Sequence, residues 1–501
     1  MTTTRRRPTA GETAARETAA VLEMGPERKT VAFARGRWLR TIPGQIRAYA
    51  VVTLLAVAAL LGVLTMAIGN ARDSVETIGH DAGPQVVATS ALYFSLSDMD
   101  AQVANILLIG REHRLGIGYD ESLRLYERRR AEAVAAAVQA AQIAGGDAEL
   151  RTTVQEVLQG LGRYERLVGQ AMLLDRQANH APGALPAQVV DAYRQATDLM
   201  RLELLPKAYN ITLDSGAAVR QAYETKRSAV LSGRTWVAVT GAIALALLLA
   251  GQVYLTRTFR RVLNPALVLA TVATLALVLV GAGLLTALAG HIRTAKQDGF
   301  ESVLALSRAR AISHSAFADE SRYLLDPGRA DTYEQTYLDK SLAVIYPDMG
   351  TRPVNLESYY AAVNSGIAGY KPGDPDPFLG FFGDEARASA RGGASANFVQ
   401  VLRSYQLVLD SDRRMRELAA KGDRAGAVDL RMGRTSNVIR DFGAYDASLS
   451  ALTAVHQRAF DTEIADADGG LRGWTALPPL AAALIAVLVA AGVRPRLAEF
   501  R

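Results

Sequence analysis

The chain has 501 residues, of which 50% are hydrophobic and 21% charged, and it carries a formal net charge of +6 and no cysteine. The absence of cysteine excludes a disulfide scaffold, a cysteine-ligated zinc or iron–sulfur site, and a thiol nucleophile. The net positive charge would suit a nucleic-acid-binding protein, so its distribution along the chain has to be examined.

Four stretches without a charged side chain are long enough for a helix to cross the hydrocarbon core of a membrane, which needs about 20 residues. They predict spans at residues 48–69, 235–255, 265–289 and 474–493, each rich in Leu, Ala and Val. Transporters of ions or polar solutes usually keep ionisable residues inside their spans, and these four spans contain none. The sequence therefore predicts a four-span membrane protein and disfavours a transporter.

The charges of the segments outside the spans predict on which side of the membrane each segment lies. Residues 1–47 hold ten Arg or Lys and four Glu, residues 256–264 hold three Arg, and residues 494–501 hold three Arg and one Glu. Cytoplasmic segments carry an excess of Arg and Lys, so we expect these three in the cytoplasm, the first as a disordered basic tail. The long segments 70–234 and 290–472 are then extracytoplasmic and together negative. We therefore predict contact with the lipid bilayer and no binding to nucleic acid.

Within residues 70–234 the apolar side chains recur at helical spacing, as in Leu150, Val154, Val157 and Leu161. Breaks rich in glycine divide this segment into four helices, predicted at about 70–110, 119–144, 147–179 and 185–232. The second long segment divides in the same way, with its last helix at about 424–472. Each segment thus has the helices of an antiparallel four-helix bundle.

The two long segments also share a layout, which predicts two copies of one module. Ser95–Arg111 and Ser313–Arg329 both begin with Ser-x-Ser and end in Leu-Leu, a break that contains glycine, and Arg. We therefore predict an all-α membrane protein with two tandem extracytoplasmic antiparallel four-helix bundles, each flanked by two transmembrane helices. The surplus of the second segment is an insertion at about 346–393. Within it, Phe378, Phe381 and Phe382 form either an exposed patch for a partner or the core of the insertion itself.

No set of residues typical of an enzyme stands out, so no catalytic, cofactor-binding or metal-binding residue is predicted. The six His include no pair three or four residues apart, and solvent-exposed positions are the better interpretation for them. The chain has no glycine-rich phosphate loop with its Lys. The predicted cytoplasmic pieces are short and scattered, so a catalytic activity inside the cell is expected to belong to another protein.

Signalling suits this layout better, because a helix that continues from an external bundle through the membrane can carry a small shift across it. Arg257, Arg260 and Arg261 lie where such a movement would reach the cytoplasm, and they are candidates for docking a partner as well as for fixing the topology. Pro206 interrupts the long fourth helix and should kink it, which makes it a candidate hinge.

Each external module resembles the four-helix-bundle sensing module of bacterial chemoreceptors. Met200–Asn210, with the sequence MRLELLPKAYN, is similar to the Leu-Leu-Pro-x-Ala stretch in the last helix of such modules. The resemblance covers the first module clearly and the second by layout alone. It departs from chemoreceptors and histidine kinases in that no linker module or output domain is expected after the second or fourth span.

The whole layout resembles the actinobacterial four-span membrane transducers that link an amino-acid-binding lipoprotein to the cytosolic serine/threonine protein kinase G. The resemblance implies a lipoprotein that binds aspartate, glutamate or glutamine outside, and a kinase that adjusts glutamate and nitrogen metabolism inside. A second copy of the chain is a further candidate partner. Two other interpretations stay open: a structural or assembly protein of the cell envelope, and a receptor that binds its ligand directly.

Overall fold

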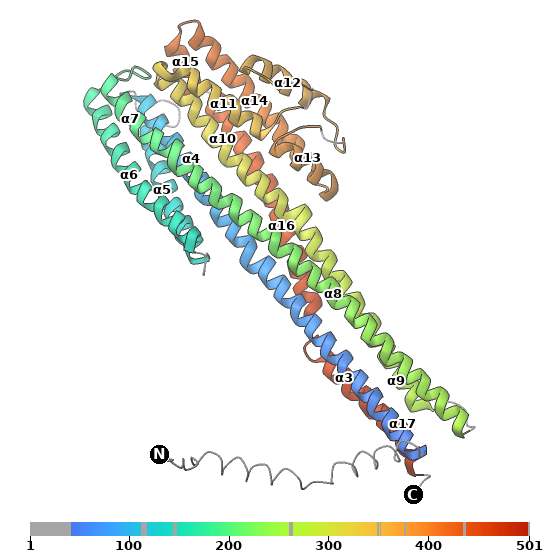
Figure 1. The fold of residues 1–501 in the computed structure, drawn as a ribbon. Coiled ribbons are helices and arrows are strands. Elements are labelled where there is room, and N and C mark those ends of the chain that lie inside the picture. The colour runs from blue at the N-terminus through green and yellow to red at the C-terminus, as the bar shows by residue number, and fades with distance from the viewer. Residues whose placement is uncertain are drawn as a thin grey trace, which may run out of the picture. The chain divides into compact units, whose positions relative to one another are not determined.

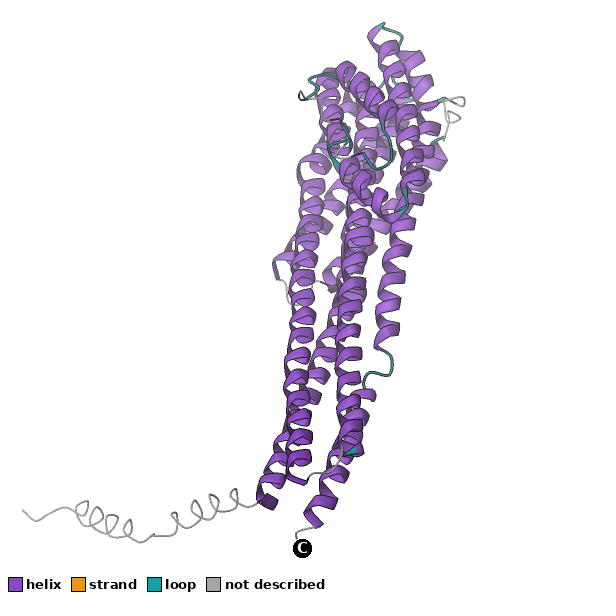
Figure 2. Cartoon of the chain, turned by 90° about the vertical axis from the view of Figure 1, so that its right-hand side faces the viewer, coloured by secondary structure: helices purple, strands orange, loops and turns teal. Residues whose placement is uncertain are grey.

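The computed structural model describes residues 42–111, 118–143, 148–259, 264–347, 350, 352–374, 377–433 and 437–498. Residues 1–41 of the basic tail that is predicted as disordered lie outside the described residues. The described chain is helical almost throughout (Figure 2). Among the described residues, Tyr346 and Leu379 form an isolated antiparallel β-bridge. The prediction of an all-α membrane protein is confirmed.

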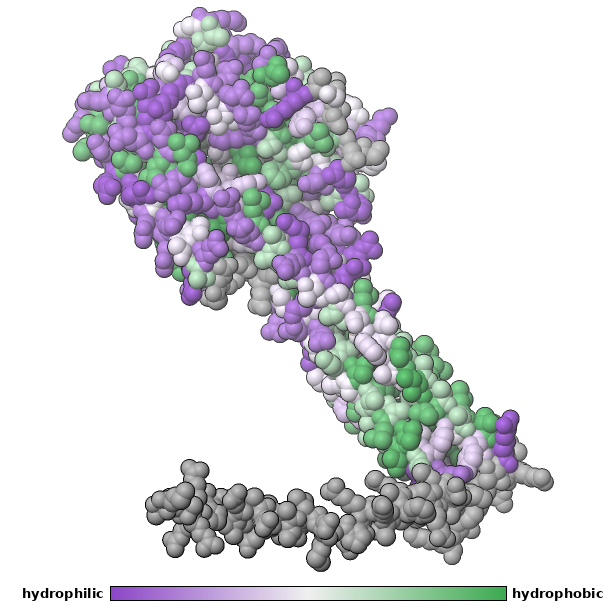
Figure 3. Space-filling model, viewed as in Figure 1, coloured by the Kyte–Doolittle hydropathy of each residue, from purple (hydrophilic) through white to green (hydrophobic). Residues whose placement is uncertain are grey.

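The chain divides into two compact units, and the first, called the membrane unit, comprises Met1–Ile68, Ser232–Leu284 and Gly473–Arg501. Its helices belong to α3 (Ile42–Val75), α8 (Leu205–Phe259), α9 (Pro265–Thr294) and α17 (Leu477–Ala498). These four helices are long and apolar enough to cross a membrane. Most of the large apolar side chains that the described residues leave exposed lie on this unit, and Figure 3 shows hydrophobic residues over its surface. Such a surface suits contact with lipid.

The fourth span begins later than the sequence predicts. Residues 472–476 form a turn instead of a helix, and α17 starts at Leu477. Gly473 has a φ of 81°, a left-handed conformation that an α-helix does not tolerate. Trp474, the next residue, is 9% exposed and packs inside the membrane unit, near Gly281.

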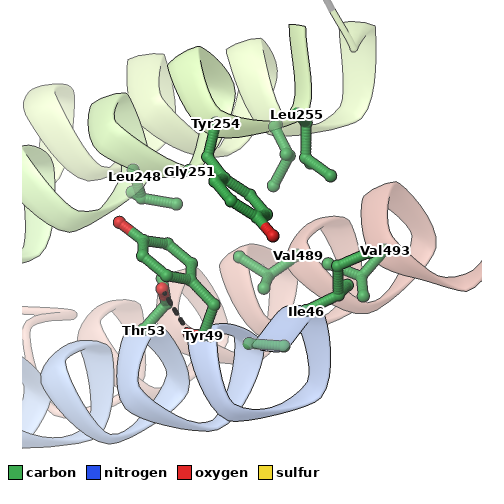
Figure 4. A pocket seen from close by; sticks show the side chains of 11 residues that line it. Ile46, Tyr49, Thr53, Leu248, Gly251, Tyr254, Leu255, Val489 and Val493 are labelled. Atoms are coloured by element: carbon green, nitrogen blue, oxygen red, sulfur yellow. Dashed lines mark hydrogen bonds between the residues drawn. The ribbon is translucent and has the colours of Figure 1, made fainter. Parts of the chain in front are cut away.

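Inside the membrane unit, aromatic side chains fill the space between α3 and α8 (Figure 4). The Tyr49 hydroxyl donates a hydrogen bond to the carbonyl oxygen of Leu247 at 2.5 Å, and the Tyr254 hydroxyl donates to Oε1 of Gln45 at 2.7 Å. A Cβ on Gly251 would lie 2.8 Å from a ring carbon of Tyr49, so glycine is needed there for the close approach. The remaining cavity of about 20 Å³ holds no more than one water molecule.

The second unit, called the extramembrane unit, comprises Gly69–Leu231 and Leu285–Arg472. Its first segment contains η1 (Glu76–Ala82), α4 (Gly83–Ile109), α5 (Tyr119–Ile143), α6 (Ala148–Ala178), α7 (Ala187–Leu199), η2 (Met200–Leu204) and the start of α8. These helices agree closely with the four that the glycine-rich breaks predict. Helices α4 and α5 pack together, as do α6 and α7.

The second segment contains η3 (Ala295–Phe300), α10 (Glu301–Leu325), η4 (Pro327–Arg329), α11 (Ala330–Val344), α12 (Leu356–Gly369), α13 (Phe381–Gly392), α14 (Ser395–Ala420), α15 (Arg424–Met432) and α16 (Asn437–Leu471). The insertion therefore folds into α12 and α13. The single last helix predicted at 424–472 is wrong, because it ends at Gly433 and restarts as α16. Gly433 has an extended conformation, with ψ at 163°, that no helix continues through.

The π-helical turns η1 and η3 occupy corresponding places after the first and third spans. The offset between Ser95 and Ser313 maps η1 onto η3 to within a residue. Each turn contains a glycine that faces α16: a Cβ would lie 2.6 Å from Ile464 at Gly79 and 2.7 Å from Phe460 at Gly299. This correspondence supports the predicted duplication.

The two segments share one hydrophobic core. Helix α4 of the first segment packs along α10 of the second. Both helices are labelled in Figure 1. The two segments therefore form one compact unit. Their description as two separate four-helix bundles stays a prediction.

Candidate functional site

The cytoplasmic docking residues predicted from sequence lie at the end of α8. Arg257 is in the last turn of that helix and is exposed. Arg260 and Arg261 lie outside the described residues. The structure therefore places one of these three cations and leaves the docking role a prediction.

The candidate hinge Pro206 is the second residue of α8 and lies two residues after the end of the π-turn η2. A proline inside a helix removes one backbone hydrogen bond and crowds the carbonyl group one turn before it. A π-turn widens the helix at that point, and such turns often lie at functional sites. Pro206 itself is exposed. The local geometry suits a hinge, and the hinge role stays a prediction.

The three phenylalanines of the insertion do not form an exposed patch. Phe378 and Phe382 are fully buried at 0% exposure, and Phe381 is half-buried at the start of α13. The ring of Phe382 lies 5.8 Å from that of Phe398 and 5.9 Å from that of Tyr405, both edge-to-face. Phe398 and Tyr405 belong to α14, so Phe382 lies in a core that the insertion shares with that helix. The burial of Phe378 and Phe382 favours a core position for them, and a partner role stays a prediction.

The burial of Phe382 makes a prediction for stability. Phe382→Ala is expected to lower the free energy of unfolding by roughly 3–5 kcal/mol, the usual cost of removing a buried aromatic ring. Leu202→Ala removes an apolar side chain that is 75% exposed and should change it by less than about 0.5 kcal/mol. Denaturant unfolding of the purified full-length protein measures both values. Unchanged stability in the Phe382 variant, together with loss of a bound protein, would restore the patch.

A buried group of charged residues that sequence analysis missed starts on α4. Nearly all side chains from Ala88 to Gly110 are buried, and the charged residues among them are Asp98 and Asp100, at 4% and 0% exposure. A buried carboxylate is costly unless a cation and hydrogen bonds compensate it. Both carboxylates receive such partners from α10. We call the resulting row of charges along α4 and α10 the ionic seam.

At one end of the ionic seam, Arg322 of α10 bridges two carboxylates. Its guanidinium binds Asp100 of α4 and Asp319 of its own helix, and all three side chains have 0% exposure. Nε of Arg322 also donates to the Tyr193 hydroxyl at 3.2 Å. Asp100 accepts a second hydrogen bond, from the Tyr164 hydroxyl at 2.8 Å. Each buried charge at this end therefore has an opposite charge and a hydrogen bond.

Further along the ionic seam, His314 of α10 lies between two carboxylates. Its Nδ1 is 3.0 Å from Oδ1 of Asp98, and its Nε2 is 2.9 Å from Oδ1 of Asp446 on α16. Burial alone would lower the pKa of His314, but the two carboxylates outweigh it and raise the pKa from 6.5 to about 9. Burial would raise the pKa of Asp98, yet His314 and Arg129 hold it well below its usual range. His314 is therefore a cation at neutral pH that links the two segments.

A second buried group of charges lies on the other side of α10. Nε of Arg431 is 3.3 Å from Oε2 of Glu320, and Nη2 of Arg431 donates to the carbonyl oxygen of Phe317 at 3.1 Å. Burial, and then repulsion from Asp412, raise the pKa of Glu320 to about 8. The ion pair lies within the second segment, but Arg431 also donates to the Ser321 hydroxyl at 2.8 Å, and that hydroxyl donates to Oδ1 of Asn105 on α4 at 2.9 Å. This group therefore also connects the two segments, through a neutral hydrogen bond.

The sequence interpretation of the histidines as solvent-exposed is wrong for three of them. His180, His314 and His456 are buried, at 8%, 7% and 2% exposure, and each contacts a carboxylate. The signal that could have found the ionic seam is α4 itself. Between Ala88 and Gly110 this helix has apolar residues on every side and no charged residue besides Asp98 and Asp100. That pattern indicates burial on all sides, so the two charges need buried partners.

The arrangement offers ion pairs and hydrogen bonds, and its cations and carboxylates neutralise one another. Among the described residues, no three His, Asp or Glu side chains are placed to hold a metal ion. The chemistry of the ionic seam is therefore that of a charged contact between helices.

One family model matches the chain. Residues 74–224, from the end of α3 to the first part of α8, match the family described as the actinobacterial sensor domain. This part of the chain is similar to a sensor domain. The match agrees with the sequence interpretation of a multi-pass membrane sensor of actinobacterial type, and it contains the carboxylates Asp98 and Asp100 of the ionic seam. No curated protein and no solved structure matches the chain.

Proposed function

We propose that this protein is a non-enzymatic transmembrane sensor that relays an extracytoplasmic signal to a cytosolic partner. The observation that carries the proposal is the course of α8. This helix begins inside the segment that is similar to a sensor domain and continues as one helix to Phe259, through the second predicted span. A continuous helix transmits a shift or rotation along its axis, provided that two packings are close in energy.

The contacts of the extramembrane unit support a coupling between its two segments. Thr212 of α8 donates a hydrogen bond to the carbonyl oxygen of Thr89 on α4, at 3.1 Å. Helix α4 in turn binds α10 through the ionic seam. A ligand or partner that shifts the second segment would therefore act on α4 and α8 of the first. Pro206, next to the π-turn η2, is the hinge in this proposal.

For the signal and its receiver, the proposal follows the layout that the chain shares with the actinobacterial transducers. Outside, a solute-binding lipoprotein presents the availability of an acidic amino acid. Inside, a serine/threonine kinase docks on Arg257, Arg260 and Arg261. The basic pieces 1–47, 256–264 and 494–501 lie in the cytoplasm, as the excess of Arg predicts.

The test is a pull-down of the full-length protein from detergent-solubilised membranes of an actinobacterial host, with and without aspartate and glutamate. We expect mass spectrometry to find a solute-binding lipoprotein and a serine/threonine kinase, in amounts that the amino acids change. Replacing Arg257, Arg260 and Arg261 with Gln should release the kinase and keep the lipoprotein.

The control for that variant replaces the same three residues with Lys. It keeps the positive charge that orients the chain, but it removes the planar guanidinium that binds carboxylates through two hydrogen bonds. Kinase recovery equal to wild type in both variants would exclude docking at these residues. Absence of lipoprotein and kinase from every pull-down would contradict the relay.

A further inference from the structure

A second polar region of the extramembrane unit is a cavity of about 300 Å³ between α8, α10, η3 and α13. Both segments therefore contribute to its wall. Four of the lining residues are cations, namely Arg220, Arg308, Arg387 and Arg391. Two other lining residues, Glu301 and Asp384, are anions.

Two of these cations already have carboxylate partners. Arg387 binds Asp384 at 2.6 Å, and Arg391 lies 3.4 Å from Oδ1 of Asp298. The remaining anion, Glu301, lies 3.6 Å from Nζ of Lys296. The carboxylates around the cavity are thus all occupied by other cations.

Arg308 and Arg220 differ from this pattern. Among the described residues, no carboxylate lies within ion-pair distance of either guanidinium. Nε of Arg308 is buried without a hydrogen-bond acceptor, and its Nη2 donates one long bond, 3.3 Å, to the carbonyl oxygen of Thr212. Burial lowers the pKa of Arg308, Tyr209 offsets part of this lowering, and the neighbouring Arg220 adds to it. A half-buried cation, Arg308, is therefore held beside an exposed cation, Arg220, and neither has a carboxylate partner among the described residues.

The two guanidinium groups converge over one glycine of α8. A Cβ on Gly216 would lie 3.2 Å from Nη2 of Arg308 and 3.7 Å from Nη1 of Arg220. Any larger residue would press on the guanidinium of Arg308. The absence of a side chain at Gly216 thus leaves room for the guanidinium of Arg308 next to that of Arg220.

We propose that this cavity binds a small organic dianion, a dicarboxylate in size and charge, through Arg308 and Arg220. Two cations that lack a carboxylate partner can bind a ligand with two negative charges. Guanidinium groups bind carboxylates through paired hydrogen bonds. The volume is at the lower end of that of small-molecule sites and larger than inorganic phosphate needs. Leu304, Ala305 and Phe381 add apolar surface for a short carbon chain.

Binding at this place would act on the helix that carries the proposed signal. The ligand would join α8, through Arg220, to α10, through Arg308, and neutralise the repulsion between them. The inference does not rest on the kinase relay, because it concerns a ligand of this chain itself. Each of the two can fail without the other.

The test is isothermal titration of the purified full-length protein in detergent with succinate. We expect saturable binding that Arg308→Gln weakens at least about tenfold, the effect of a lost hydrogen bond between charged groups. Arg391→Gln, which removes a cation with a partner from the same cavity, should weaken it by less than about threefold. Without ligand, Arg308→Gln should melt at the wild-type temperature or above it, because it removes a half-buried charge that lacks a carboxylate partner and whose Nε is buried without an acceptor.

A second variant keeps the charge and changes only its place. Gly216→Ala suits a helix and should fold, yet it should weaken succinate binding by displacing Arg308. Titrations with L-glutamate and inorganic phosphate identify the ligand. Binding of phosphate as tight as that of succinate would overturn the dicarboxylate, and absence of binding for all three would overturn the site. Equal weakening of succinate binding by the Arg308 and Arg391 variants would mean that binding is a nonspecific effect of positive charge.

Discussion

Arg322→Met is expected to lower the free energy of unfolding by roughly 3–5 kcal/mol, the cost of breaking a buried ion pair by removing one partner. The substitution leaves the carboxylates of Asp100 and Asp319 in a site with 0% exposure. Asp319 keeps the ammonium of Lys340, whereas Asp100 keeps only neutral hydrogen-bond donors. Most of the loss should therefore come from Asp100.

A double variant separates this cost from the value of the pair. In Arg322→Met with Asp100→Leu, neither charge remains at the contact of α4 with α10, and apolar side chains replace both. Replacement of a buried pair by apolar residues is often neutral or stabilising, so we expect the double variant to regain most of the lost stability. Denaturant unfolding of the full-length protein, followed by circular dichroism, measures the cycle.

The control is Arg329→Met. Arg329 lies just after α10 and binds Asp198 at 3.0 Å, but both side chains are more than a third exposed, at 38% and 36%. An exposed pair of this kind contributes about 0–1 kcal/mol. Equal losses in the Arg322 and Arg329 variants would mean that the ionic seam does not hold the two segments together.

The helices of this protein could be predicted because local patterns determine them. The charge-free runs gave the four spans, and the glycine-rich breaks gave α4, α5, α6 and the helix that ends in α8. The errors lie where a single residue changes the backbone. At Gly433 and Gly473 the helix stops, although the apolar pattern continues on both sides. The pattern records which face is buried, and it does not record a local break.

The ionic seam could not be predicted in the same way, because its partners are far apart in the sequence. Asp98 and His314 are separated by 216 residues, and Asp100 and Arg322 by 222. A helical pattern relates residues within a few turns only. Asp98 and Asp100, on a helix without any other charged residue, do indicate buried charges, but the identity of their partners depends on how the two segments pack. The cavity between α8, α10 and α13 depends on the same packing.

The second large effect is expected for pH, through His314. Its pKa is 6.5 when unperturbed and about 9 in the folded protein, so the folded state binds the proton more tightly than the unfolded state. The stabilisation from this proton is fully present below pH 6.5 and is lost as the pH rises through 9. A difference of about 2.5 pKa units corresponds to roughly 3 kcal/mol of unfolding free energy.

His314→Gln isolates this contribution from other groups that titrate in the same range. Glu320, with its pKa raised to about 8, also destabilises the fold as the pH rises, whereas Lys340, with its pKa lowered to about 8, acts in the opposite direction at higher pH. Both are unchanged in the variant. Its two carboxylates keep cations, since Arg129 binds Asp98 and Arg310 binds Asp446.

Unfolding curves of the wild-type protein and the His314→Gln variant between pH 6 and pH 10 should therefore differ most at the acidic end and converge at the basic end. The reason is that deprotonated His314 and Gln are both neutral, so the two proteins have the same charge between Asp98 and Asp446 above pH 9. A constant difference across the whole range would mean that His314 is not protonated in the folded state. The contact between α4, α10 and α16 would then depend on the shape of the imidazole ring, and the charge of the ionic seam would come from the Arg residues alone.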